Sequence, residues 1–327
     1  MESSTLRMFA LELKSRFDCW WMILRTSLAE RLAYRGDFAL GTLMRFLPII
    51  TQIFLWWAIF DAVGDGGSSR LAGYTFQDMV AYYLLSMLAR AFSSMPGLAS
   101  NIAKQIREGE IKKYITQPID LLSFTMISRL AHKIAYYTVA TLPFALVFFL
   151  CRDYFTSGWP SAEIMVAFVL SLIMAFMLGF LMDMCIGLVG FWFLEVSSLL
   201  FVYMLLNFFL SGHMFPLDLL PDGNEPATTH AVSSSLDSPA AASSSSGDIS
   251  NPSDTKDGAW QFPFRSVVSF LPFKYLAYFP AAIFLEKIAP DRLWFEMGVE
   301  VAWLIFFIVL ARILYSLGLR RYSGYGG

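Results

Sequence analysis

Long apolar runs separated by short charged segments cover most of the chain. A transmembrane helix needs about 20 predominantly apolar residues, and six of these runs come close to that length or exceed it. They are predicted to span at about 41–60, 76–102, 134–150, 162–189, 196–210 and 294–314. We therefore expect an all-α, polytopic membrane protein with six transmembrane helices.

The first 38 residues follow a different pattern, in which apolar and charged residues alternate at helical spacing. Phe9, Leu13 and Phe17 recur at intervals of four, while Lys14 and Asp18 fall between them. This pattern predicts an amphipathic helix that lies along the cytoplasmic membrane face and does not cross it. A soluble helix that packs on the protein's own loops remains the alternative.

A charged segment, NIAKQIREGEIKKYITQPID at 101–120, lies between the second and third predicted spans. Gly109 allows the chain to change direction between two short helical pieces, and Pro118 ends the second piece. An amphipathic stretch at 121–133 then leads into the third span. The charges suit either a protein-binding surface or a solvated loop, and both interpretations stay open on this pattern alone.

Basic residues are distributed unequally between the two sides of these six spans. Only Arg70 and Arg152 lie in the first two loops on the side opposite the termini. The other side holds fifteen of the twenty-four basic residues: Arg7, Lys14, Arg16, Arg25, Arg31, Arg35, Lys104, Arg107, Lys112, Lys113, Arg129, Lys133, Arg312, Arg320 and Arg321. Short loops rich in Lys and Arg stay in the cytoplasm. We therefore expect both termini and the segment 101–120 to be cytoplasmic.

The stretch between the fifth and sixth spans divides into three parts. Residues 211–221 are apolar, contain proline and are too short to span, which predicts an interfacial or re-entrant piece that completes the region 39–221. Residues 222–262 are rich in Ser and Ala and are predicted to be disordered outside the cell. Within 263–327, Pro272, Pro280 and Lys274 divide an apolar run into short interfacial helices before the last span and the tail.

Composition supports the membrane assignment and excludes several other classes. Hydrophobic residues make up 57% and charged residues 15%, with a mean hydropathy of +0.56, whereas soluble domains carry roughly 25% charged residues. The net charge of −2 and the charge distribution give no indication of a nucleic-acid partner. Neither a G-x-x-x-x-G-K-[ST] nucleotide motif nor an H-E-x-x-H or G-x-S-x-G motif occurs. We therefore expect no enzymatic activity, no cofactor and no metal site in this chain.

Three polar residues fall inside the predicted spans: Arg90, Asp183 and Asn207. A charge near the bilayer centre costs about 2.5–3.5 kcal/mol on insertion scales, so such residues usually face a bundle interior or a cavity. One hypothesis pairs Arg90 with Asp183 along a translocation path. The alternatives are that both side chains reach toward an interface, and that Asn207 joins two helices.

Five stretches, in chain order, resemble one family: YRGDFALG followed by WWAIFDA, IREGEIKKYITQPID, LSGHMFPLDLLP, LPFKYLAYFPAAIFL and the terminal RRYSGYGG. They are similar to the membrane (permease) subunits of type-2 ABC exporters. The Ser- and Ala-rich stretch departs from the family, whose members usually have a much shorter link there.

This resemblance implies a permease subunit that pairs with a second copy or a sister permease. Two separate ABC ATPase subunits, which bind ATP and Mg²⁺, would dock beneath it. The segment 101–120 would be the coupling helix, with Arg107, Glu108, Gly109, Glu110, Lys112, Tyr114 and Pro118 as its candidate contact residues. The N-terminal amphipathic helix would be the connecting helix.

The function expected from these observations is export of a hydrophobic or amphipathic substrate across the cytoplasmic (inner) membrane of a prokaryote. The alternative is an ion-coupled secondary transporter or channel. That class predicts several intramembrane acids and half-helices at repeated positions, and the sequence contains no clear internal repeat.

Overall fold

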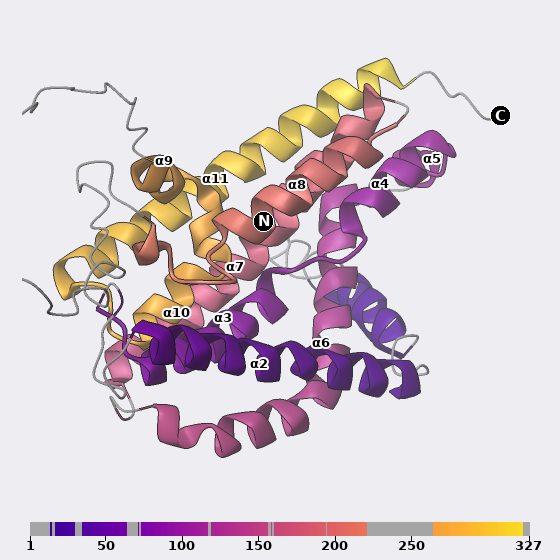
Figure 1. The fold of residues 1–327 in the computed structure, drawn as a ribbon. Helices are drawn as coiled ribbons and strands as arrows, with labels where there is room; N and C mark the ends of the chain where they lie inside the picture. The colour runs from indigo at the N-terminus through magenta and orange to yellow at the C-terminus, as the bar shows by residue number, and fades with distance from the viewer. Residues whose placement is uncertain are drawn as a thin grey trace, which may run out of the picture.

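The computed structural model describes residues 14, 17–29, 35–63, 71, 73–116, 119–155, 158, 160–193, 195–220 and 264–322. Apart from an isolated bridge between Leu71 and Tyr74, the regular structure in these ranges is helical (Figure 1). Residues 17–29 form a helix near the N-terminus. It is followed by α2 (Arg35–Val63), α3 (Phe76–Ser93), α4 (Leu98–Arg107), α5 (Lys112–Thr116), α6 (Leu121–Leu150), η1 (Arg152–Tyr154), α7 (Ala162–Leu188), η2 (Val189–Phe191), α8 (Ser197–Leu210), η3 (Leu217–Leu219), α9 (Phe264–Phe270), η4 (Pro272–Leu276), α10 (Tyr278–Phe284) and α11 (Pro290–Arg321).

Two of the described helices are long and apolar enough to cross a membrane by themselves, Ala162–Phe191 and Pro290–Arg321. α6 is a third if its two halves, which meet at an angle of 53°, count as one span. Pro143 accounts for a bend there, because its ring clashes with the carbonyl four residues earlier and it has no N–H to donate. The apolar parts of α2 and α8 are shorter. The chain is thus an all-α membrane protein with two or three spans identified by length and composition.

The helix boundaries differ from the prediction on both sides of the charged segment. The second predicted span, 76–102, is interrupted, because α3 ends at Ser93 and α4 begins only at Leu98. Pro96 disfavours a helical conformation in the residue before it, and Gly97 adopts a left-handed φ of 72°. By contrast, the predicted lead-in and the third span form one helix, α6. Asp120 caps the N-terminus of this helix, because its side chain accepts a hydrogen bond from the Ser123 backbone N–H.

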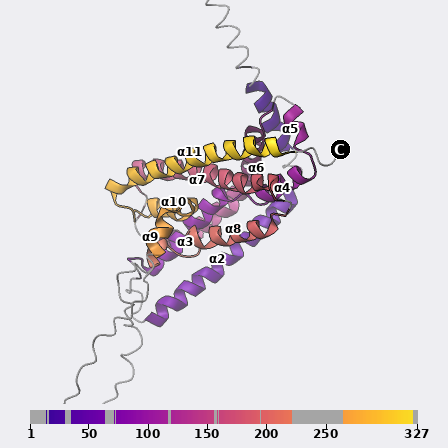
Figure 2. The ribbon, with the colours of Figure 1, turned by 90° about the horizontal axis from the view of Figure 1, so that it is seen from above.

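α7 lies at the centre of the bundle and packs against α3, α4, α10 and α11, as the two views of the ribbon show (Figures 1 and 2). Apart from Glu163 and Asp183 its residues are apolar or small on all sides, which is the pattern of a helix with no solvent-facing stripe. Its buried residues, such as Leu172 and Leu178, belong to the largest apolar core of the described chain.

Contacts along α7 show that three segments run in the same direction. Ser93, Ala99 and Ala103 lie beside Gly179, Gly187 and Gly190, so α3 and α4 run parallel to α7. Likewise Glu300, Phe307 and Gly318 of α11 contact Ser171, Cys185 and Phe191. The C-terminal ends of α4, α7 and α11 therefore meet at one end of the molecule, which we call the α4 end. The opposite end, which contains α10 and the start of α3, is called the α10 end.

The region between α8 and α11 consists of short elements where it is described. α8 ends at Leu210, and η3, α9, η4 and α10 are each seven residues or shorter. Pro272 starts η4, as expected from a break, but Pro280 lies inside the first turn of α10. A proline is tolerated there because its missing N–H would have no helical partner. The predicted disordered stretch 222–262 lies outside the described residues.

Candidate functional site

The segment α4–α5 has one apolar face turned inward and one polar face turned outward. On α4 the buried residues are Leu98, Ala99, Ile102, Ala103 and Ile106. Asn101 and Lys104 lie between them in sequence, Arg107 and Glu108 follow, and all four are exposed. Spacing of three and four residues places the apolar side chains on one helical face. The charged residues in the described part of the segment are therefore exposed, which fits both a protein-binding surface and a solvated loop.

Glycines on α7 and η2 let the backbone at the end of α3 and along α4 come into direct contact with these helices. A Cβ atom on Gly179 would lie 2.1 Å from the Ser93 carbonyl oxygen, and one on Gly187 would lie 2.9 Å from the Ala99 carbonyl oxygen. Gly190 meets Ala103 in the same way, at 3.1 Å. The backbones of α4 and α7 are therefore in direct contact, with no side chain between them at these positions.

The chain turns between α4 and α5 as the sequence predicts. Gly109 has a φ of 79°, in the left-handed region that glycine adopts without strain. Tyr114, a predicted contact residue, is buried, and its ring lies 5.5 Å from the Phe124 ring of α6. Tyr114 therefore holds α5 against the bundle, whereas its neighbour Ile115 is 52% exposed. Pro118 lies outside the described residues.

The charges on the outer face pair within the segment itself. Lys104 lies 3.9 Å from Glu108, and Lys113 lies 3.3 Å from Glu110. Exposed pairs of this kind contribute about 0–1 kcal/mol to stability, because water and salt screen them. They consequently contribute little to the fold and leave a charged surface open to a partner.

One ion pair at the α4 end does join two distant parts of the chain. The Arg312 guanidinium of α11 donates to the Asp120 carboxylate at 2.6 Å. Partial burial would raise the pKa of Asp120, but the hydrogen bonds from Arg312 and Ser123 outweigh it and hold that pKa below its ordinary value. Trp20 of the N-terminal helix and Arg312 line the same cavity beside α6 and α7. The N-terminal helix thus lies against the α4 end.

The three polar residues predicted inside the spans line one cavity of about 400 Å³ between α3, α4, α7 and α8. The Arg90 guanidinium lies 5.6 Å from the centre of the Phe208 ring. The ion pairs of the described residues do not include one between Arg90 and Asp183. Ser93 of α3 lies against Gly179 of α7. Arg90 is three residues before Ser93, and Asp183 is four residues after Gly179. At about 1.5 Å of rise per residue, about 10 Å along the helix axes separates the two positions.

Two basic residues of the predicted lead-in also have an inward role. The Lys133 ammonium donates to the Ser94 carbonyl at 2.7 Å and to the Ala91 carbonyl, and Arg129 Nη1 donates to the Pro96 carbonyl at 3.2 Å. These carbonyls lie at and just beyond the end of α3, where carbonyl groups lack helical partners. α6 thereby fixes the break between α3 and α4.

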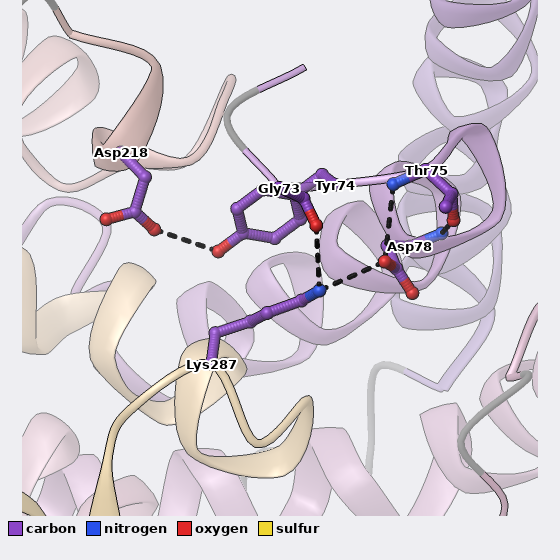
Figure 3. A network of polar contacts seen from close by, with 6 residues as sticks. All are labelled: Gly73, Tyr74, Thr75, Asp78, Asp218 and Lys287. Atoms are coloured by element: carbon purple, nitrogen blue, oxygen red, sulfur yellow. Dashed lines mark hydrogen bonds and ion pairs between the residues drawn. The ribbon is translucent and has the colours of Figure 1, made fainter. Parts of the chain in front are cut away.

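A polar network at the α10 end was not predicted (Figure 3). Asp218 accepts hydrogen bonds from the Tyr74 hydroxyl at 2.9 Å and the Tyr278 hydroxyl at 2.8 Å, and it pairs with Arg265 at 3.1 Å. Burial and, after it, the Asp218 charge raise the pKa of Tyr74, so its hydroxyl stays protonated and donates. No local sequence pattern places Asp218 beside residues so distant in the chain.

The same network binds the start of α3. The Lys287 ammonium donates to Asp78 at 3.0 Å and to the Gly73 carbonyl at 3.2 Å (Figure 3). Asp78 also completes a capping box with Thr75 at the N-terminus of α3. The T-x-x-D spacing could have predicted the capping box from the sequence. No sequence pattern predicts that Lys287 bonds to Asp78.

Two acids on α11 were overlooked although the sequence shows them inside the last predicted span. Glu296 accepts from the Lys274 ammonium at 2.8 Å and from the Tyr275 hydroxyl at 2.7 Å. Glu300 is fully buried, and Ser171 of α7 donates to one of its oxygens at 3.2 Å. Its other oxygen has no hydrogen-bond partner. In the part of the chain that the structure describes, no three His, Cys, Asp or Glu side chains are grouped so that they could hold a metal ion.

Comparison with known proteins identifies the family. A family model described as ABC-2 family transporter protein matches residues 46–224 and 254–326, which is most of the chain. The interval between the two matched parts, residues 225–253, falls inside the predicted insert at 222–262. No curated protein matches the chain. The matched length, together with the all-α membrane fold, shows that the chain belongs to the ABC-2 transporter family, as a type-2 ABC permease.

Proposed function

We propose that this permease is the membrane-spanning subunit of an ATP-driven exporter for a hydrophobic or amphipathic substrate. A separate ABC ATPase subunit supplies the energy from the cytoplasm. The observation that carries the proposal is the double character of α4: its outer face is charged and exposed, and its inner face is in backbone contact with α7 at Gly187. A force applied to the outer face therefore reaches the centre of the bundle.

The proposed topology has six crossings, made by α2, α3, α6, α7, α8 and α11, with both termini in the cytoplasm. The parallel course of α3, α7 and α11 supports it, because the second, fourth and sixth crossings of such a chain run in one direction. The α4 end holds the basic residues that favour the cytoplasm, among them Arg107, Lys112 and Arg320. As its location we propose the cytoplasmic membrane of a prokaryote.

Two permease subunits, identical or different, complete the proposed transporter. α8 has no buried residues in the isolated chain. Phe201, Met204 and Phe209 on it are each more than half exposed. α8 is also one wall of the polar cavity that Arg90 and Asp183 line. Its position leaves a large apolar face for a second subunit or for lipid, next to the polar residues of the proposed path.

ATP hydrolysis is assigned to the partner, together with the bound Mg²⁺. The chain lacks the glycine-rich phosphate-binding motif and its lysine. Export then depends on alternating rearrangement of the permease subunits, which the ATPase transmits through α4 and α5. The chain turns at Gly109 between α4 and the short helix α5.

Purification of the tagged full-length chain from its native cells in a mild detergent tests the proposal. ATPase activity should accompany the wild-type chain. Reversing two exposed charges, Arg107→Glu with Lys112→Glu, should lower the accompanying activity at least about tenfold, because a loss of about 1.4 kcal/mol at the interface has that effect. Arg152→Glu, an exposed reversal in η1, is the matched control and should leave it unchanged. Absence of ATPase activity from the wild type, or equal activity in both variants, would reject the proposal.

The ion-coupled alternative has one observation in its favour, the buried carboxyl group of Glu300 between α7 and α11. Asp183 and Glu296 are further acids inside the predicted spans, and that class of transporter uses such acids for coupling ions. Transport in vesicles separates the two mechanisms. The exporter requires ATP and the ATPase, whereas the alternative responds to a pH gradient without ATP and stops in Glu300→Gln.

A further inference from the structure

We propose that the cavity beside the α3–α4 break binds a zwitterionic head group, with its anionic group near Arg90 and the start of α4 and its ammonium group near Asp183. The inference rests on the proposed export function and names the chemical class of the ligand. The cavity volume of about 400 Å³ lies within the range of about 300–1,000 Å³ that small-molecule sites occupy.

The anion-binding half combines a cation with an uncapped helix terminus. Arg90 and the first residues of α4, Leu98, Ala99 and Ser100, line the cavity together. Gly97 at the N-cap position provides no side chain to accept hydrogen bonds from the first N–H groups of α4. Such groups, with the positive end of the helix dipole, attract phosphate and carboxylate groups.

A buried hydroxyl group without a partner provides an independent sign of a missing ligand. Ser211 lines the cavity and is 2% exposed, yet its hydroxyl oxygen has no hydrogen-bond partner. The Tyr203 hydroxyl is buried and already interacts with Asp183 and Asn207. Buried polar groups in proteins are nearly always satisfied. A polar ligand in this cavity would satisfy the Ser211 hydroxyl group.

The cation-binding half is formed by Asp183, with Asn207 and Tyr203 on the facing helix α8. Arg129 and Lys133 of α6 also interact with Asp183 through their positive charges. Both cations also donate to backbone carbonyls around the α3 break. A carboxylate in this position attracts an ammonium group and repels a second anion. A simple anion therefore suits the Arg90 side of the cavity and not the Asp183 side.

The separation of the two charges favours a ligand that carries both. Arg90 and Asp183 are offset by about 10 Å along the helix axes, so neither neutralises the other directly. The remaining walls are apolar and include Met95, Leu200 and Leu276. Met204 lines the cavity and is also 56% exposed on the surface of α8. An alkyl chain attached to the head group can therefore extend past Met204 toward the bilayer.

Competition for photo-crosslinking tests this inference with the purified full-length chain in a nonionic detergent. The probe is lysophosphatidylethanolamine with a photoactivatable group in its chain. The competitors are unlabelled lysophosphatidylethanolamine, lysophosphatidylglycerol, which lacks the ammonium group, and dodecylamine, which lacks the phosphate. Free phosphoethanolamine, which lacks the chain, separates a lipid from a soluble zwitterion. We expect lysophosphatidylethanolamine to compete at least about tenfold better than either single-charge amphiphile, because each lost charge-assisted contact costs about that factor.

Variants locate each charge. In Arg90→Gln, lysophosphatidylethanolamine should no longer compete better than dodecylamine but should still compete better than lysophosphatidylglycerol. Asp183→Asn should do the reverse. Arg152→Gln and Asp153→Asn, both exposed in η1 at the opposite end, are the matched controls and should behave as the wild type. Thermal midpoints show whether each variant is folded, and the comparison of competitors on the wild type requires no variant.

Equal competition by lysophosphatidylethanolamine and lysophosphatidylglycerol on the wild type would overturn the proposal. A uniform loss for all competitors in both variants would overturn it as well. Competition by free phosphoethanolamine at the same concentration would support the zwitterion site and assign it to a soluble ligand. The assay uses no ATP and no partner subunit, so its failure leaves the ATPase co-purification test unaffected. Failure of co-purification likewise leaves ligand binding unaffected.

Discussion

The two ends of this permease are held together by different forces. At the α4 end, α3 and α4 lie on α7 through glycine contacts, and the charges of α4 and α5 face outward. At the α10 end, the charges of Asp218, Lys287 and Glu296 bond to other side chains and join segments that are distant in the sequence. Close backbone packing, together with the Asp120–Arg312 pair, holds the first end, whereas polar bonds add to the apolar core at the second.

This difference supports the proposal that the α4 end receives the partner. Charged groups that bond one another inside a fold are no longer available for recognition, whereas exposed pairs are weak and can exchange partners. The α4 end keeps its charges exposed on a rigid base, as a docking surface requires. The α10 end uses its charges to fix the start of α3 and the short helices before α11. Four predictions test this contrast, beginning with the largest expected effect.

Replacing Gly179 by alanine should cause the largest loss of stability. The added Cβ would lie 2.1 Å from a backbone oxygen of Ser93, so α3 and α7 must separate. We expect a loss of about 3 kcal/mol, at the upper end of overpacking effects, seen as a lower thermal midpoint and yield in detergent. Gly298→Ala is the control, because nothing lies within 4 Å of its Cβ position on α11, and it should be neutral or slightly stabilising. Equal behaviour of the two variants would contradict the close contact.

Asp218→Asn should destabilise the α10 end by about 1.5–3 kcal/mol, the cost of losing hydrogen bonds to a charged group. The amide keeps the shape of the side chain but loses the charge that pairs with Arg265 and accepts from two tyrosines. Thermal unfolding in detergent measures the change. Asp153→Asn, with a side chain that is 87% exposed, should have no measurable effect. If Asp218→Asn behaves as Asp153→Asn does, the network does not hold this end.

The Asp120–Arg312 pair should give a pH-dependent contribution of about 1 kcal/mol or less, because both side chains are partly exposed. The pKa of Asp120 is lowered in the folded chain, so its stabilisation is present above the unfolded pKa of about 3.9. It is lost as the pH falls through the lower, folded value. Wild type should therefore exceed Asp120→Asn in stability at neutral pH, with the difference shrinking in acid. A difference that grows below pH 4 would refute the assignment.

Removing an outward charge should have the smallest effect on stability. Glu110→Gln breaks only an exposed pair with Lys113 and should change the free energy of unfolding by less than about 0.5 kcal/mol. The thermal midpoint of the purified chain measures it. A loss as large as that of Asp218→Asn would show that the outer face of α5 belongs to the fold and is not reserved for a partner.

The sequence predicted the local features of both ends better than their tertiary contacts. Gly109 marked the turn between the two short helical pieces of the charged segment, because a turn of this kind depends on neighbouring residues. The break after Ser93 was missed, since an apolar run that contains Pro96 can still be read as one span. The bonds of Asp218 could not be predicted, because they join residues more than forty positions apart. Glu300 was visible inside an apolar run but was not recognised.

The central claim is that the charged face of α4 and α5 lies in the cytoplasm and the α10 end lies outside. Single cysteines at Arg107, Lys112 and Asp153, in a chain without Cys19 and Cys151, test it with a membrane-impermeant maleimide on intact cells. Cys185 is buried and can remain. We predict that the cysteine at position 153 reacts from outside, and that those at 107 and 112 react only after the cells are permeabilised. Labelling of 107 or 112 in intact cells would show that the protein is oriented the other way and would contradict the account.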